Sequence, residues 1–371
     1  MKQLSRYLSY WRTTVVRDRE IVEAGVRPEH QGPSAELADA LEAWSGLHYW
    51  ADSGDERSLV LIRSLGPPQR ERWWLHILLF VMTFFAVWMA GAMLVGSSVS
   101  LHVPPEVTIG SIAAAFTNWI GRVAPGLQFA LALMAILLAH EMGHYVLAKR
   151  YKINVSLPYF LPAPFWWTFI GTFGAFIRIR SPIVDRRQLM DVGSAGPWAG
   201  FVVAMVCVTV GLSNSTVLPS LSGGAAQVIM VGDMRFYLGD SLMMFGTRSL
   251  MGIDGTVLLH PIAFAGWLGL FVTTLNLLPL GQLDGGHVLY ALVGDRQKIF
   301  GWILWYLLIV LGFQFRGWWL WAGLTLLLGG GRMSHPSVLD KHRPMPANRG
   351  PLGWATVLLF VVTFTPIPFP L

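Results

Sequence analysis

The five residues His140-Glu141-Met142-Gly143-His144 combine two side chains that can bind a metal with one that can move a proton. Two histidines at i and i+4 share one face of a helix, and the glutamate between them can reach a water on the metal. The spacing therefore predicts a zinc site of the metalloprotease type. His140 and His144 would be ligands, and Glu141 would be the catalytic base.

This motif lies in a segment that is apolar enough to cross a membrane. From Gly126 to Ala139 no residue is charged, and Lys149 is the next charged residue after Glu141. An ionisable cluster at membrane depth is costly and usually marks a functional site. The alternative is two packed histidines and a buried glutamate with no metal. A third ligand on another span would argue against that alternative, because catalytic zinc takes three protein ligands and keeps one open position.

Asp284 is the candidate third ligand, in the stretch that runs from Asn276 through Pro279 to Asp284-Gly285-Gly286-His287. This stretch ends the fourth predicted span on the same side of the membrane as the motif. Proline and glycine break a helix where the backbone must bend to present a side chain. His287 is the alternative ligand. Asn276 is a candidate for holding the substrate backbone or its oxyanion, with a structural helix cap as its alternative role.

The composition is that of a protein that crosses the membrane several times. Of the 371 residues, 54% are hydrophobic and 13% are charged, whereas soluble domains carry about 25% charged residues. The net charge of +6 comes from Lys and Arg beside apolar segments, without a basic stripe or base-stacking aromatic residues, so we expect no nucleic-acid partner. A single cysteine, Cys207, excludes an intramolecular disulfide.

Apolar runs of membrane-spanning length predict an all-α domain of six or seven transmembrane helices over residues 73–371, with a catalytic core at about 126–297. The two short runs joined near residue 315 could form one interrupted element, which would give six spans. Lys and Arg concentrate in loops on one side, which predicts a cytoplasmic N-terminus in a cell membrane. The predicted spans are 73–97, 126–149, 191–213, 258–280, 298–314, 317–331 and 351–368.

Residues 1–72 are predicted to form a separate soluble or membrane-surface region, since they hold 11 of the 21 acidic residues and 10 of the 27 basic ones. Apolar residues at helical spacing predict two short amphipathic helices, the second one capped by Ser34. These residues are Leu4, Leu8, Trp11 and Val15 in the first helix and Leu37, Leu41 and Trp44 in the second.

The segment from Val155 to Arg180 is too rich in proline for a span, and its second half alternates in the manner of a strand. We expect a membrane-associated β-hairpin or re-entrant loop, which must be shielded by protein or line a wet cavity. Its open edge could bind an unwound substrate as an added strand. A purely structural hairpin is the alternative. The candidate substrate-binding or supporting residues in this segment are Gly171, Thr172, Phe173 and Gly174.

Three motifs in order make the chain resemble the site-2 protease family of intramembrane zinc metalloproteases. They are the motif at 140–144, Gly196-Pro197-Trp198-Ala199-Gly200, and Asn276 through Asp284-Gly285. The resemblance implies zinc bound by the two histidines and Asp284, Glu141 as the base, and the hairpin beside the active site. It also implies a transmembrane protein substrate, with a single span, in the lipid bilayer. Pro197 and its flanking glycines most simply let the third span approach the second.

Two other functions make different demands on the sequence. A membrane zinc transporter would need further ligands along a path across the bilayer, and the outer halves of the predicted spans carry almost none. A membrane protease of the prenyl-protein-processing type would need a downstream glutamate as its third ligand. Glu141 is the last glutamate of the chain, which excludes that type.

Overall fold

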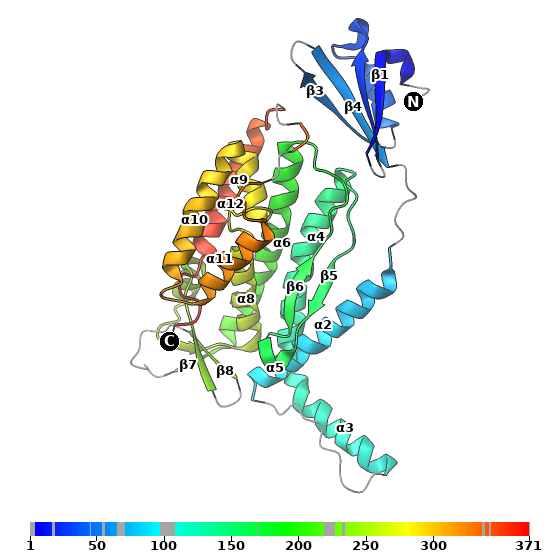
Figure 1. Cartoon of the computed structure of the whole chain (residues 1–371). Coiled ribbons are helices and arrows are strands. Elements are labelled where there is room, and N and C mark those ends of the chain that lie inside the picture. The colour runs from blue at the N-terminus through cyan, green and yellow to red at the C-terminus, as the bar shows by residue number, and fades with distance from the viewer. Residues whose placement is uncertain are drawn as a thin grey trace.

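The structure is a computed structural model and is mostly helical (Figure 1). Three helical segments are long and apolar enough to cross a membrane, and α8, Pro261–Asn276, is a shorter apolar helix. The three segments are α2, Trp73–Leu94; Gly110–Arg150, which contains α4, Leu127–Arg150; and α6, Arg186–Ser213. The structure describes residues 4–16, 19–44, 46–53, 56–64, 71–96, 108–168, 170–218, 227–231, 234–335, 338–340 and 343–370.

The N-terminal region is a four-stranded antiparallel sheet in the order β1-β2-β4-β3, with α1 packed against it. The second predicted helix is correct: α1 begins after Ser34, whose hydroxyl accepts from the N–H of Leu37 at 3.3 Å. The first predicted helix is wrong, because its residues from Leu8 on form β1. The elements are β1 Leu8–Val16, β2 Arg19–Val26, α1 Ala35–Glu42, β3 Leu47–Ser53 and β4 Glu56–Ser64.

The predicted all-α fold is therefore wrong where the chain forms four-stranded sheets, here and in residues 216–258. In the N-terminal region the physical reason lies in the sequence of β1. Spacing of four residues is compatible with a helix, but Thr13, Thr14, Val15 and Val16 are four consecutive β-branched residues. Branching at Cβ restricts χ1 against the preceding helical turn and suits the pleated surface of a sheet. Pairing with β2 along nearly its whole length then fixes the segment as a strand.

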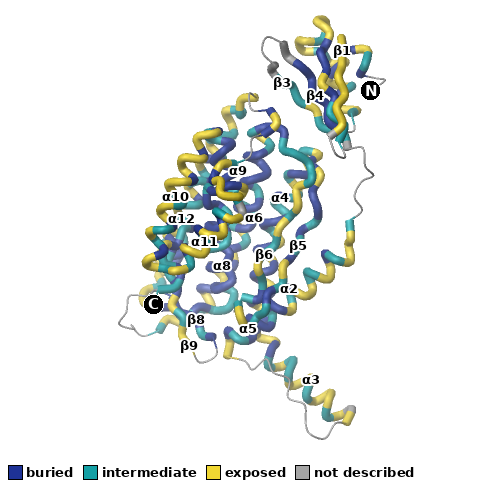
Figure 2. The backbone as a smooth tube through the Cα atoms, in the orientation of Figure 1, coloured by how far each residue is buried: buried dark blue, intermediate teal, exposed yellow. Residues whose placement is uncertain are grey.

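The core of the membrane domain is formed by α4, α6 and α8, which pack side by side and bury Phe129, Val208 and Trp267 completely or nearly so. Figure 2 shows buried positions concentrated along α6 and α8, whereas α10 is largely exposed. The remaining helices surround this core. They are α3 Ile109–Val123, α9 Asp284–Val293, α10 Gln297–Leu311, α11 Gly317–Leu328 and α12 Gly350–Thr363.

Each predicted span coincides with a helix, but the predicted lengths were too great in the C-terminal half. The helix α8 has 16 residues, and α10, α11 and α12 have 15, 12 and 14. A helix of about 20 residues is needed to cross the apolar layer without help from its flanks. Among the described residues, three helical segments are therefore long and apolar enough to cross a membrane.

Two small sheets flank the helices. One lies beyond the end of α6 and the start of α8, in the strand order β7-β10-β8-β9. The other is the antiparallel pair β5 and β6, which lies between α2 and α4 (Figure 1). Short helices accompany them: α5, Phe165–Thr168, and α7, Leu242–Leu250. The strands are β5 Tyr159–Pro162, β6 Thr172–Phe176, β7 Thr216–Leu218, β8 Gln227–Val231, β9 Met234–Leu238 and β10 Thr256–Leu258.

Candidate metal centre

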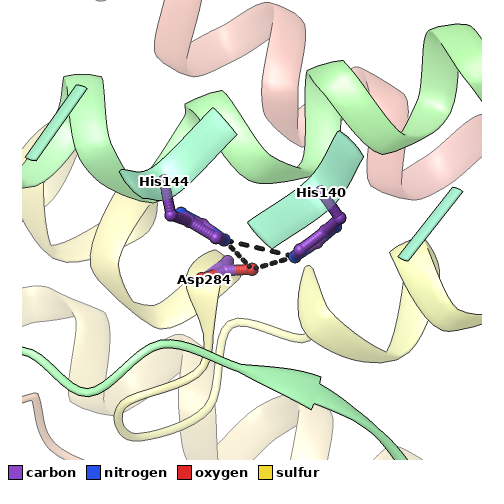
Figure 3. Close-up of side chains that lie close together, drawn as sticks. All are labelled: His140, His144 and Asp284. Atoms are coloured by element: carbon purple, nitrogen blue, oxygen red, sulfur yellow. Dashed lines mark hydrogen bonds and ion pairs between the residues drawn. The ribbon is translucent and has the colours of Figure 1, made fainter. Parts of the chain in front are cut away.

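Three side chains predicted from the sequence meet at one point between α4 and the start of α9 (Figure 3). Asp284 Oδ2 lies 3.2 Å from Nε2 of His140 and 3.2 Å from Nε2 of His144, and the two Nε2 atoms are 3.2 Å apart. Both histidines are buried. Among the described residues, these three form the group of His, Cys, Asp and Glu side chains that could hold a metal ion.

The size of this triangle fits zinc. Two donor atoms that are each about 2.0–2.1 Å from a zinc ion, at a tetrahedral angle, lie about 3.3–3.4 Å apart. The three observed separations are close to this value, so the three donors could occupy one face of a tetrahedron. The fourth corner would then be left for water or substrate, as in catalytic zinc sites.

The hydrogen bond at Nδ1 of His144 leaves Nε2 available for a metal ion. Nδ1 lies 2.7 Å from the carbonyl oxygen of Val192, so Nδ1 carries a proton and donates it to that acceptor. In the neutral form, His144 then presents a lone pair at Nε2 toward the carboxylate of Asp284. A hydrogen bond from the second ring nitrogen to a backbone carbonyl is typical of metal-binding histidines. The donor set and its supporting hydrogen bond therefore suit a metal ion.

The helix break predicted before Asp284 explains how that residue is presented. The helix α8 ends at Asn276, before Pro279, and Asp284 is the first residue of α9. The two glycines that follow open α9 rather than forming a turn. A Cβ at Gly285 would lie 1.9 Å from the carbonyl oxygen of Leu277, so only glycine lets the start of α9 pack on the preceding loop.

The predicted close approach of the second and third spans is also present. A Cβ at Gly196 on α6 would lie 2.1 Å from Nε2 of His144, and one at Gly200 would lie 3.1 Å from Cβ of His140. Pro197 is buried inside α6 between these glycines, and its missing N–H removes the helical bond to Gly193. The α6 motif thus forms a wall against which both histidine rings pack.

Gly196→Ala is therefore expected to displace the His144 ring and to lower zinc affinity by at least about tenfold, the scale of losses caused by disturbing a ligand's support. Zinc titration of the purified protein measures this. Gly323→Ala in α11 is the matched control, because a Cβ at Gly323 meets no heavy atom within 4 Å. Equal zinc affinity in both variants would contradict the packing role.

The triad opens into a cavity of about 230 Å³ that also contains Glu141, Asn276 and His287. Glu141 is buried, and Ile177 lines the cavity together with it. Nδ2 of Asn276, the last residue of α8, lies 3.3 Å from Nε2 of His140. Nδ1 of His287 instead lies 2.6 Å from Nε2 of His335.

The hairpin forms one wall of this cavity, but through residues that the sequence analysis did not select. Gly171 to Gly174 build the hairpin itself. Gly171 has φ +83° and packs against Ala86, and the Thr172 hydroxyl donates to Leu161 O at 2.9 Å. Phe173 is exposed. The cavity is lined instead by Ala175, Phe176, Ile177 and Ile179. The alternation of Ala175, Ile177 and Ile179 in the sequence was the signal that could have identified three of them.

One edge of this strand faces the cavity. The carbonyl of Arg178 accepts from Ser156 N at 3.0 Å, and Arg180 N donates to Asn154 O at 2.8 Å. Backbone groups of successive strand residues point to opposite edges. The N–H and C=O groups of Ile177 and Ile179 therefore point away from residues 154–156, and both residues line the cavity that contains Glu141.

The fold and the site define a class: a helical membrane protein in which an HExxH helix and an aspartate at the start of a later helix form a metal site. Residues 128–311 match the model of peptidase family M50. The chain belongs to this family, the site-2 protease family, as the resemblance predicted.

Curated relatives include plant proteins named as probable zinc metalloproteases of the chloroplast. EGY1 of Oryza sativa subsp. japonica is 32% identical over 247 residues, 64% of this chain and 40% of the relative. EGY1 of Arabidopsis thaliana is 34% identical over 181 residues, 48% and 31% of the two chains, and EGY2 of that plant is 30% identical over 191 residues, 50% and 32%. The chain thus spans less than half of each relative. No solved structure matches it.

Proposed function

We propose that the protein is an intramembrane zinc metalloprotease, which hydrolyses peptide bonds within or next to transmembrane segments in regulated intramembrane proteolysis. One observation carries this proposal. Three converging ligand atoms and a buried glutamate line one cavity, and three of these four residues lie on α4, which carries no other charged residue before Lys149 at its end. The relatives named as zinc metalloproteases support the choice of metal and reaction.

His140, His144 and Asp284 would hold the zinc. Bound zinc polarises a carbonyl group and makes a water molecule more acidic. Glu141 takes the proton from the attacking water and delivers it to the leaving amine. Its carboxylate lines the same cavity as the three ligands. Asn276, whose Nδ2 lies 3.3 Å from Nε2 of His140, would hold the substrate carbonyl or backbone.

The substrate would bind in extended form along the cavity edge of the hairpin. A transmembrane helix conceals its amides in hydrogen bonds, so it must unwind before cleavage. The outward backbone groups of Ile177 and Ile179 offer replacement partners in the form of an added strand. Gly171, Thr172, Phe173 and Gly174 would support this edge from the other end of the hairpin. Pro197 would support the α6 wall.

The placement in the membrane is part of the same proposal. Residues 1–72 would be a domain on the cytoplasmic side, and residues 73–371 would be the protease domain, with six or seven spans and β5–β6 as a re-entrant element. The basic loops support this orientation. The EGY relatives are named as chloroplastic, so they give no support to a cell membrane.

Metal removal tests the activity. The purified protein in lipid vesicles is expected to cleave some members of a panel of tagged single-span proteins. A zinc chelator should stop cleavage, and added zinc should restore at least about half of the original rate, because the ligands stay in place. Gel analysis of the tagged fragments measures this. Cleavage that continues with zinc fully removed would contradict the proposal, and zinc flux into sealed vesicles without cleavage would indicate a transporter.

A further inference from the structure

His287 lies in the cavity without joining the metal ligands. It is three residues after Asp284, and residues at i and i+3 lie on the same face of a helix. It lines the same cavity as Glu141 and the triad. However, the group of ligand atoms that lie within 4.8 Å of one another contains only the two histidines of α4 and Asp284. His287 is therefore available for another function in the cavity.

A second histidine fixes the orientation of the His287 ring. His335 lies in the segment between α11 and α12, and its Nε2 is 2.6 Å from Nδ1 of His287. At this distance the two nitrogens must share a proton. The His335 ring is itself stacked on Tyr290, with centroids 4.8 Å apart. With Nδ1 engaged, Nε2 is the only ring nitrogen that His287 can present to the cavity.

A buried amide holds His335 in this position. Gln297, at the start of α10, is 1% exposed, and its Oε1 accepts from His335 N at 3.0 Å. Its Nε2 donates to Pro279 O at 3.0 Å and to Met333 O at 3.1 Å. Both N–H groups and the carbonyl of this side chain are thus used. They tie the segment carrying His335 to the loop that presents Asp284.

The opposite side of His287 is also packed. A Cβ at Gly193 of α6 would lie 2.9 Å from Cβ of His287, so α6 contacts the histidine closely at this position. With its Cβ packed against Gly193 and its Nδ1 bonded to His335, His287 has little freedom to change rotamer. Preorganised donors of this kind need no rearrangement as charge develops in a transition state.

We propose that His287 is a further catalytic residue, which donates a hydrogen bond from Nε2 to the scissile carbonyl oxygen as this oxygen becomes anionic, and that His335 is its positioning residue. The proposal rests on the proposed protease function. Donation from His335 to Nδ1 of His287 leaves the proton of His287 on Nε2. The carboxylates of Glu141 and Asp284 line the same cavity, and a carboxylate can only accept, which favours a donor at this nitrogen.

Four variants test the pair: His287→Leu, His335→Leu, the double variant, and His335→Gln, which keeps a donor for His287. The first should retain zinc, as measured by metal analysis, and should lose about 100-fold in single-turnover cleavage rate, the scale for one oxyanion donor. The double variant should be no slower than His287→Leu, because the residues act as a unit. His335→Gln should be faster than His335→Leu by about tenfold. His260→Gln is the control for loss of a histidine, because His260 caps the start of α8, whereas the cavity lies at the end of this helix near Asn276. This variant should cleave at the wild-type rate.

The outcomes separate this proposal from the protease assignment. If the wild type cleaves nothing, the protease assignment fails. If it cleaves and His287→Leu is equally fast, or has lost its zinc, the role of His287 is overturned. Additive losses in the double variant would show that His335 acts independently. If His287→Leu does not accumulate as folded protein, equal rates for His335→Leu and His335→Gln would overturn the positioning role.

Discussion

Replacement of Glu141 by glutamine is expected to lower the cleavage rate by at least about 10²- to 10⁴-fold, the usual contribution of a general base. Glutamine has the shape of glutamate, so the cavity that this side chain lines should keep its structure. Only the ability to take a proton is removed. Because Glu141 is not among the three convergent ligands, zinc content should stay at the wild-type level.

The measurement is single-turnover cleavage of a tagged single-span substrate in vesicles, together with metal analysis of the same preparation. Glu36→Gln makes the same chemical change at an exposed site on α1 and is expected to cleave at the wild-type rate. Equal rates for Glu141→Gln and the wild type would show that the activity does not come from this site.

The metal centre could be predicted from the sequence because its constraints are local. Two histidines one helical turn apart must share a face, and an apolar helix leaves them few uses other than metal binding. The prediction of Asp284 required a further inference, that the helix breaks at the same membrane depth as the two histidines. The structure brings these three residues together, and their function as ligands remains a prediction.

The supporting contacts could not be predicted, since they depend on partners far along the chain. Nothing near His144 specifies the Val192 carbonyl, 48 residues away, that fixes its tautomer. His287 and His335 are also 48 residues apart, and the connecting amide, Gln297, resembles any polar residue at the start of a helix. Local patterns contain no information about such pairs.

In the N-terminal sheet, a prediction from the sequence was wrong for a different reason. The spacing of Leu4, Leu8, Trp11 and Val15 is compatible with a helix, and a nine-residue strand can show the same spacing by chance. Pairing between β1 and β2 fixes the segment as a strand, because this tertiary contact overrides a weak local preference for a helix. Ser34 and α1 were predictable because a cap is a local interaction.

Asp284→Ala is expected to reduce zinc affinity by more than about 100-fold, beyond the 10–100-fold typical of losses in the surrounding shell. The carboxylate supplies the only negative charge among the three ligands, and it lies 3.2 Å from both imidazoles. Without it, His140 and His144 retain two neutral donors. Asp284→Asn, which keeps the shape without the charge, should fall between Asp284→Ala and the wild type.

Zinc titration of purified protein, compared with His287→Ala and with Asp254→Ala as an exposed control, decides which residue is the third ligand. The contact of His287 with His335 predicts that His287→Ala keeps its zinc. If Asp284→Ala kept zinc and His287→Ala lost it, the ligand set would be three histidines, and His287 would have to turn away from His335. The packing of His287 against Gly193 and the complete hydrogen bonding of Gln297 both oppose that turn.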